Sequence, residues 1–283
     1  VFGGSAWELD TKTDQYYLHT FDKEQPDLNW HNKKVQSEMF DTLRFWSKRG
    51  VDGFRVDAIY HLIKDQKLKD EPQNPNYMKE AFMDLPVLSP FDSLLHIHTV
   101  GLPKSLALIK KMVGVVKFEK NKFIITEAYT SFDEIIKLYQ VVGWKHYQPF
   151  NFSLIKLPWT AKAHKEFIDK YDKAVGSKYF PSWVSGNHDV PRAATRLGKD
   201  QLRNLAIMLL TLRGIPFIYF GDEIGMEDGQ IAKNEVKDTF EINLPGHGLG
   251  RDPQRTPMQW NDKKYAGFSQ KKPWLPVASN YKN

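Results

Sequence analysis

Three short apolar runs, far apart in the chain, each lead into an acidic residue. The runs are GFRVD at 53–57, FIITE at 123–127 and WVSGNHD at 183–189. In a barrel of alternating strands and helices, catalytic groups lie where the strands end, so carboxylates from three strands can meet in one pocket. Carboxylates that converge in this way favour glycoside chemistry.

Helical patterns separate these runs. Apolar residues recur at helical spacing over 32–50, where Asn32 is a suitable N-cap and Gly50 a suitable end. Further helices are expected at 104–116, 132–140, 160–173 and 202–212, and strands at 51–58, 123–126, 147–152, 183–186 and 215–220, with none before residue 51. The three strands that lead into acidic residues look buried, and the five strands alternating with helices predict a parallel α/β sheet or barrel.

Two long segments interrupt this alternation, at 64–101 and 227–283. The first is rich in Pro, Asp and Asn, and the second has turn residues with only isolated apolar positions. Loops of this length inside a compact domain are usually functional.

The composition limits the class of protein. With 283 residues, of which 41% are hydrophobic, the chain has enough apolar material for a core. No stretch approaches the roughly 20 apolar residues of a membrane span, and no signal-peptide pattern is visible. The absence of cysteine excludes disulfides and fits a reducing compartment, so we expect a cytoplasmic protein without a membrane partner. The net charge of +6 is spread over mixed segments, which indicates a solvated surface and no nucleic-acid partner.

Six separated motifs occur in a specific order. QPDLN at 25–29, GFRVD at 53–57, TE at 126–127 and NHD at 187–189 together resemble the α-amylase superfamily, glycoside hydrolase family 13. GDEIGM at 221–226 and RDPQRTPMQW at 251–260 resemble its α-glucosidase and oligo-1,6-glucosidase branch more than starch-cleaving amylases.

This resemblance implies a (β/α)8 TIM barrel, present here from about strand 4 to strand 8. Residues 1–30 would be the end of the inserted small domain and the lead-in to the barrel, and 31–283 its second half with long βα loops. We expect a fragment, because the family's early strands are missing and the chain starts at Val1. Without the early strands, one edge of strand 4 would have no neighbouring strand. We therefore expect the isolated chain to be inactive or prone to aggregate unless a partner segment supplies the other half of the barrel.

The resemblance also implies three catalytic carboxylates. Asp57 would be the nucleophile that forms a covalent glucosyl ester, and Glu127 the general acid and base. Asp189 would bind sugar hydroxyls and strengthen that interaction in the transition state. A general acid of this kind works best if its pKa is raised towards the working pH.

Substrate-binding roles follow for four further residues. His188 would donate a hydrogen bond to the same sugar, and Arg255, or alternatively Arg251, would reach the sugar pocket. Arg55 lies two residues before Asp57 on the same strand face, so its charge can keep Asp57 ionised. In the family, Ala58 after the nucleophile accompanies α-1,4 rather than α-1,6 cleavage.

The expected function is therefore a retaining α-glucosidase acting on short, maltose-like oligosaccharides. A transglycosylase, or an isomerase that rearranges sucrose or trehalose, is the alternative, and a non-catalytic barrel of the transporter heavy-chain type is a distant one. No cofactor or catalytic metal is expected, and a structural calcium, if present, would lie in the missing N-terminal part. The oligomeric state stays open.

Several other polar and aromatic residues allow two interpretations. Asp27 and Asn29 are expected to stabilise the entry to strand 4 through side-chain hydrogen bonds to the backbone. Asp222 and Glu223 follow the last strand, and loop anchoring is favoured over substrate contact. Phe150 and Phe152 are candidates for lining the sugar pocket.

Overall fold

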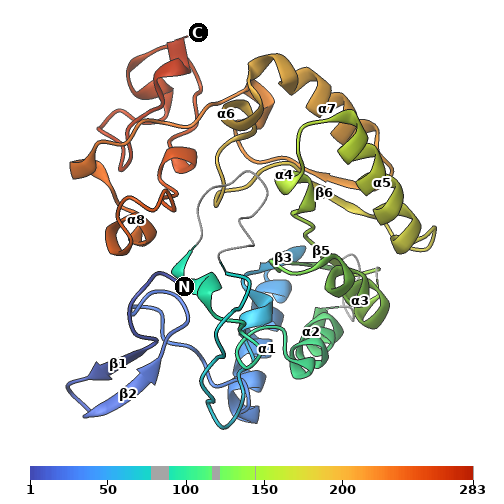
Figure 1. The fold of residues 1–283 in the computed structure, drawn as a ribbon, viewed down its shortest axis with the longest axis vertical. Coiled ribbons are helices and arrows are strands. Elements are labelled where there is room, and N and C mark those ends of the chain that lie inside the picture. The colour runs from blue at the N-terminus through green and yellow to red at the C-terminus, as the bar shows by residue number, and fades with distance from the viewer. Residues whose placement is uncertain (78–88, 117–121, 144, 283) are drawn as a thin grey trace.

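The structure is a computed structural model that describes residues 1–77, 89–116, 122–143 and 145–282 (Figure 1). Parallel strands alternate with helices through most of the chain. The order is β1 (Trp7–Asp10), β2 (Gln15–Leu18), α1 (Lys33–Lys48), β3 (Gly53–Val56), α2 (Pro103–Val116), β4 (Phe123–Thr126), α3 (Phe132–Val142), β5 (Tyr147–Pro149), α4 (Ser153–Lys156), α5 (Ala161–Val175), β6 (Ser182–Val184), α6 (Ala193–Leu197), α7 (Leu202–Thr211), β7 (Ile215–Phe217) and α8 (Thr239–Asn243).

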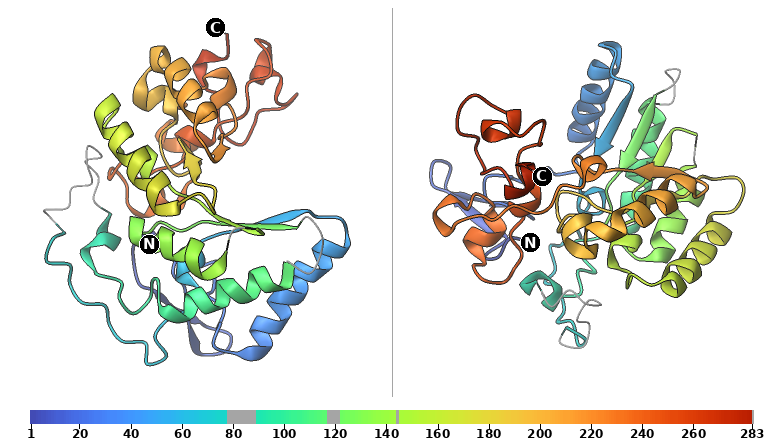
Figure 2. Two further views of the ribbon diagram at one scale, coloured as in Figure 1. Left: turned by 90° about the vertical axis from the view of Figure 1, so that its right-hand side faces the viewer. Right: turned by 90° about the horizontal axis from the view of Figure 1, so that it is seen from above.

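The barrel strands form two parallel groups. β3, β4 and β5 pair in that order, and β6 pairs with β7. Val56 lies opposite Thr126, which in turn lies opposite Pro149, so the three strands end at one level. Helices α1, α2 and α3 lie along one side of the first group, while α5 and α7 lie against the second (Figures 1 and 2).

Local sequence signals explain where the helices begin. The Asn32 side chain accepts a hydrogen bond from the Lys34 amide and caps α1. Ser131 caps α3 and Thr160 caps α5 in the same way. The expected helices at 32–50, 104–116, 132–140, 160–173 and 202–212 are thus confirmed within a few residues.

The expected strands are present. The strand at 123–126 has the expected bounds, the other four are shorter, and β3 is less buried than predicted. In β3 the alternating residues Gly53 and Arg55 are exposed, so the prediction of a buried strand is wrong there. Within the described residues β3 pairs only with β4 and is therefore an edge strand. After β7 the chain turns, which leaves Ile218 53% and Phe220 40% exposed.

The expectation of no strand before residue 51 is wrong. β1 and β2 form an antiparallel hairpin, with Trp7 opposite Leu18 and Asp10 opposite Gln15. Asp10 stabilises the turn by accepting hydrogen bonds from the Lys12 amide and the Thr13 hydroxyl. Each strand has only four residues, and those of β2 do not alternate between buried and exposed, so no strand pattern stands out in the sequence.

A buried polar network joins the two strand groups. The Gln148 amide on β5 donates to the Tyr139 hydroxyl and to the Phe180 carbonyl. The Ser182 hydroxyl on β6 donates to the Pro149 carbonyl over 2.6 Å. β6 therefore stands in a fixed position next to β5, although no ladder joins them in the described chain. Over the same residues no helix has the length and apolarity that crossing a membrane requires.

The main core lies between the helices and the β3–β5 sheet. Its fully buried members include Ile59, Ile109, Ile124, Leu138 and Tyr147. Ile124 and Tyr147 lie on neighbouring strands and face this core, which fixes the strand ends relative to the helices. The core thus determines where the acidic residues emerge.

Gly214 is a point at which the fold admits no side chain. It has a φ of +135°, and a Cβ there would lie 2.3 Å from the Pro181 carbonyl oxygen and 2.8 Å from Nε1 of Trp183. We expect Gly214→Ala to lower the free energy of unfolding of the complete protein by about 2 kcal/mol or more. Denaturant titration measures this.

Gly114→Ala is the matched control. Gly114 lies inside α2, and a Cβ at this position would meet no neighbouring segment within 4 Å. Alanine should therefore stabilise the protein by about 0.5 to 1 kcal/mol. Equal effects of the two substitutions would contradict the steric explanation.

Candidate active site

Asp57 and Glu127 emerge side by side from β3 and β4. The Glu127 amide donates to the Val56 carbonyl over 2.9 Å, and the Ile59 amide donates to the Glu127 carbonyl over 3.1 Å. These bonds continue the strand pairing past the strand ends. The register of the sheet therefore brings the two carboxyl groups together.

Arg55 joins the two carboxyl groups through a single nitrogen. Its Nη2 lies 3.2 Å from Oδ1 of Asp57 and 2.5 Å from Oε2 of Glu127. Arg55 and Asp57 are two residues apart, so they lie on the same face of the strand end. The Glu127 side chain is only 6% exposed, whereas that of Asp57 is 69% exposed. The pair thus has one buried and one open carboxyl group.

The difference in burial gives the two carboxyl groups different pKa values. Burial, followed by the hydrogen bond with Asp57, raises the pKa of Glu127 to about 8, although Arg55 opposes the shift. The hydrogen bond from Glu127 lowers the pKa of Asp57, and the charges of Arg55 and His188 act in the same direction. Near neutral pH the proton therefore resides on Glu127, and Asp57 is ionised.

Ala58 occupies the left-handed region with a φ of 44°. This conformation is unusual for a residue with a Cβ and costs about 1 to 2 kcal/mol. It turns the chain directly after Asp57 into a short 3₁₀ helix at Ile59–His61, whose Ile59 and Tyr60 are buried. The turn leaves Asp57 at the open end of the strand.

The third carboxylate, Asp189, has one oxygen in contact with two arginines and a histidine. Its Oδ1 lies 2.8 Å from Nη2 of Arg255, 3.2 Å from Nη1 of Arg251 and 3.4 Å from Nε2 of His188. Its backbone amide donates to Oδ1 of Asn187 over 2.9 Å. Both arginines that the sequence left as alternatives therefore reach Asp189.

His188 lies between these charges and is half-buried. Burial lowers its pKa, Arg255 and Arg55 lower it further, and Asp189 opposes them. The ring is therefore largely neutral at pH 7, which suits a hydrogen-bond donor to a neutral ligand. Its backbone carbonyl accepts from Nε of Arg255 over 2.9 Å, so the two residues are fixed together.

Arg251 is held by a partner that the sequence analysis missed. Its guanidinium donates to Asp238, with the shortest distance 2.6 Å, and lies 4.9 and 5.0 Å from the ring centres of Phe2 and Phe240. Burial opposes the ionisation of Asp238, but the hydrogen bonds and charge of Arg251 lower its pKa. Nothing in the local sequence around Asp238 indicates this role.

Glu127, His188 and Asp189 are the one group in the described chain whose donor atoms approach metal-ligand spacing, within 4.8 Å of one another. However, Arg55 contacts Glu127, and both arginines described above contact Asp189. A cation would therefore face several positive charges at close range. The arrangement suits a neutral polyhydroxylated ligand better.

Asp222 and Glu223, the two acidic residues that follow the last strand, anchor the loop after β7. Oδ2 of Asp222 accepts from the Tyr219 amide, and Oε2 of Glu223 accepts from the Gly221 amide over 2.7 Å. Loop anchoring, the favoured interpretation, thus agrees with their contacts. Phe152 lies near the site. Its ring stacks on that of Tyr129 with ring centres 4.5 Å apart, and the Tyr129 hydroxyl lies 3.5 Å from Oδ2 of Asp189.

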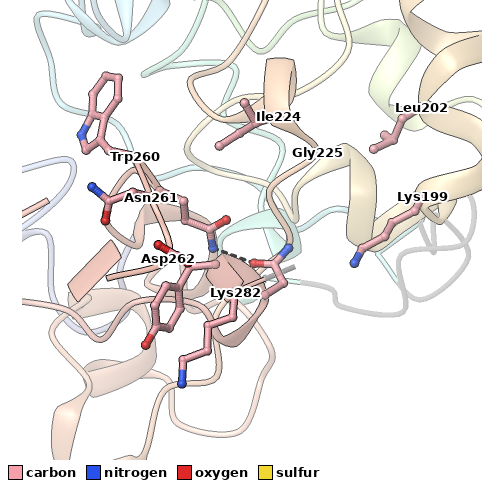
Figure 3. A pocket seen from close by; sticks show the side chains of 11 residues that line it. Lys199, Leu202, Ile224, Gly225, Trp260, Asn261, Asp262 and Lys282 are labelled. Carbon is pink, nitrogen blue, oxygen red and sulfur yellow. Dashed lines mark hydrogen bonds between the residues drawn. The ribbon is translucent and has the colours of Figure 1, made fainter. Parts of the chain in front are cut away.

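A separate cavity of about 700 Å³ lies between the start of α7 and the C-terminal loops (Figure 3). Its lining includes Lys199, Ile224, Trp260 and Lys282, together with the hydrogen-bonded pair formed by Gln259 and its neighbour Asn280. None of the carboxylates or arginines described above lines it. The candidate site is therefore the strand-end cluster and not this cavity.

Comparison with known proteins places this geometry in a family context. Residues 1–283 match the family described as alpha amylase, catalytic domain. An alpha-glucosidase of Apis mellifera is 36% identical over 295 residues, covering 100% of this chain and 49% of that protein. An oligo-1,6-glucosidase of Bacillus cereus is 33% identical, with coverages of 100% and 54%. The chain spans about half the length of the curated relatives it matches.

Comparison with solved structures supports the same family. The crystal structure of an alpha-glucosyl transfer enzyme superposes with a TM-score of 0.86 at 32% identity, covering 99% of this chain and 53% of that one. A trehalulose synthase mutant gives a TM-score of 0.79 at 30% identity, with coverages of 99% and 54%. The expectation of a partial (β/α)8 barrel is thereby confirmed.

Replacement of Arg251 tests its structural role. Arg251→Gln would leave the buried carboxylate of Asp238, which is 3% exposed, without its cation. We expect a loss of about 3 kcal/mol in the free energy of unfolding, because an unpaired buried charge is costly. The double variant Arg251→Gln with Asp238→Asn should recover part of this loss. A double variant no more stable than the single one would contradict the ion-pair explanation.

Proposed function

The chain belongs to the α-amylase catalytic-domain family, and from this premise we propose that it carries the catalytic residues of a retaining α-glucosidase. The single observation that carries the proposal is the contact of one Arg55 nitrogen with both Asp57 and Glu127. It couples an ionised carboxylate to a protonated carboxyl group, which is the pairing that a nucleophile and a general acid require. The alpha-glucosidase relatives support the choice of glucose as the sugar.

In the first step, a carboxylate oxygen of Asp57 attacks the anomeric carbon of the terminal glucose. The bond from that carbon to the glycosidic oxygen breaks, and Glu127 transfers its proton to the departing oxygen. In the second step, the ionised Glu127 removes a proton from water, and the water oxygen displaces Asp57 from the anomeric carbon. Two inversions give net retention, and both carboxyl groups return to their starting states.

The separation of the carboxyl groups favours retention over inversion. Because one nitrogen contacts both, their facing oxygens lie less than about 6 Å apart, below the range of roughly 6.5 to 9.5 Å that inverting enzymes need for a water. The nucleophile is the more exposed member, so a sugar has access to it. The acid is the buried member, which keeps its proton.

Asp189 and His188 are proposed to bind sugar hydroxyls, with Arg255 and Arg251 fixing the carboxylate. Hydrogen bonds that sugar hydroxyls donate to this carboxylate strengthen as positive charge develops at the ring, so they lower the barrier. The proposed chemistry uses only side chains for its proton transfers and its nucleophile. It therefore needs an oligosaccharide and water but no cofactor.

A transferase or sugar isomerase is the second candidate. The similarity to an alpha-glucosyl transfer enzyme and a trehalulose synthase supports it. The two functions share the first step and differ in whether water or a sugar hydroxyl accepts the glucosyl group. Product analysis with sucrose and maltose distinguishes them, since an isomerase returns a disaccharide of equal mass.

The function is tested with p-nitrophenyl α-glucoside and the complete protein that contains this chain. We expect turnover with retained anomeric configuration, measured by proton NMR of the first product. Asp57→Asn should lower kcat by at least about a thousandfold, because it removes the nucleophile. Asp41→Asn, on the exposed face of α1, is the control and should leave kcat unchanged. Near-normal turnover by Asp57→Asn would refute the assignment.

The pH dependence of the activity follows from the shifted pKa values of Asp57 and Glu127. Activity requires ionised Asp57, whose pKa is lowered, and protonated Glu127, whose pKa is raised to about 8. The profile of kcat/KM should therefore be bell-shaped, with activity lost at high pH as Glu127 loses its proton near pH 8. Glu127→Gln should abolish this alkaline limb for a substrate with a good leaving group. An alkaline limb that persists in the variant would point to another acid.

Linkage preference is proposed to depend on Ala58, which favours α-1,4 over α-1,6 bonds. We expect the ratio of kcat/KM for maltose to that for isomaltose to exceed one. Ala58→Val should lower this ratio, although its left-handed φ also makes a β-branched residue strained. Ala58→Thr is the matched control for that strain, and an equal fall with both variants would contradict a role in linkage preference.

A further inference from the structure

The two oxygens of Asp189 have different surroundings. Oδ1 is contacted by Arg255, Arg251 and His188. Among the described residues, the contact of Oδ2 is the hydroxyl of Tyr129, at 3.5 Å. Because Oδ1 is occupied by the two arginines and His188, Oδ2 is the oxygen with free capacity to accept a hydrogen bond from a ligand.

The direction of the hydrogen bonds around Tyr129 is determined. Nδ2 of Asn187 donates to the Tyr129 hydroxyl over 2.8 Å, since an amide nitrogen has no lone pair to accept with. The hydroxyl proton is thus free to point at Asp189. Burial of the hydroxyl and the negative charge of Asp189 raise the pKa of Tyr129 above its ordinary value, so the proton is retained.

A stack of aromatic rings holds the Tyr129 ring in place. The ring packs on Phe152 at an interplanar angle of 22°, and Phe152 lies 5.6 Å from Phe150. Phe150 in turn contacts Phe217 of β7 at 4.7 Å. The hydroxyl is therefore fixed relative to strands β5 and β7, while Tyr129 as a residue is 46% exposed.

The distance of 3.5 Å is longer than a strong O–H···O bond. Arg251 and Arg255 hold Oδ1, and the weaker contact of Tyr129 lies on Oδ2 and leaves that oxygen able to accept a further hydrogen bond. A hydroxyl group that approaches Oδ2 would meet a carboxylate already turned towards it. Preorganisation of this kind acts on the transition state, because the carboxylate need not reorient as charge develops.

We propose that Tyr129 is a positioning residue for Asp189, which turns Oδ2 towards a hydroxyl of the terminal sugar. The inference rests on the proposed function, since it assigns that hydroxyl to the glucose held for cleavage. Nothing in the short motifs around Glu127 or Asp189 indicates the role, because the contact joins residues 60 positions apart.

The test is Tyr129→Phe in the complete protein, which removes the hydroxyl and keeps the ring stack. We expect kcat/KM for p-nitrophenyl α-glucoside to fall about tenfold, through both a lower kcat and a higher KM, with the melting temperature unchanged. Tyr16→Phe, on the exposed β1–β2 hairpin, is the matched control and should have no effect. Unchanged kinetics in Tyr129→Phe would overturn the inference.

A set of monodeoxy p-nitrophenyl glucosides separates positioning from a general structural effect. For the substrate that lacks the hydroxyl bound by Asp189, the tenfold difference between wild type and Tyr129→Phe should disappear. The same loss on every deoxy substrate would overturn the inference. So would a fall in melting temperature that accounts for the loss.

Glucose binding, measured by calorimetry, distinguishes failure of the inference from failure of the proposed function. If the wild-type protein hydrolyses no α-glucoside but binds glucose, weaker binding by Tyr129→Phe still supports the positioning role. Equal binding by both proteins overturns it. A wild-type protein that neither hydrolyses glucosides nor binds glucose overturns both.

Discussion

Arg55 contacts Asp57 and Glu127 through one nitrogen, and the chemistry of the site depends on this contact. Two carboxyl groups this close cannot both be ionised without a large electrostatic cost, so one proton is shared between them. The unequal burial of the pair decides that the proton lies on Glu127. The parallel register of β3 and β4 places all three residues, which links the fold directly to the acid and nucleophile roles proposed for them.

The parts of this arrangement that depend on local sequence were predictable. The helices, the strand at 123–126 and the position of each acidic residue at a strand end follow from periodicity and from short motifs. The structure brings Asp57, Glu127, His188 and Asp189 into one cluster with Arg55 and Arg255, as the family resemblance implied.

Other parts depend on contacts between distant segments and were not predictable from the sequence. Asp238 fixes Arg251 from within an irregular segment, and Tyr129 approaches Asp189 across 60 residues. The exposure of β3 was also missed, because its apolar appearance gives no information on how many strands pair with it. Periodicity reports which face of an element is buried, whereas these features depend on which elements become neighbours.

The most direct test of the account is to trap the proposed ester at Asp57 with a 2-deoxy-2-fluoro-glucosyl donor that has a good leaving group, and to locate it by peptide mass spectrometry. Fluorine destabilises the positively charged transition states, and the activated leaving group lets the ester form faster than it is hydrolysed. The account predicts a fluoroglucosyl group on the peptide that contains Asp57 and on no other. A label on a different carboxylate, or turnover with inverted configuration and no label, would contradict it.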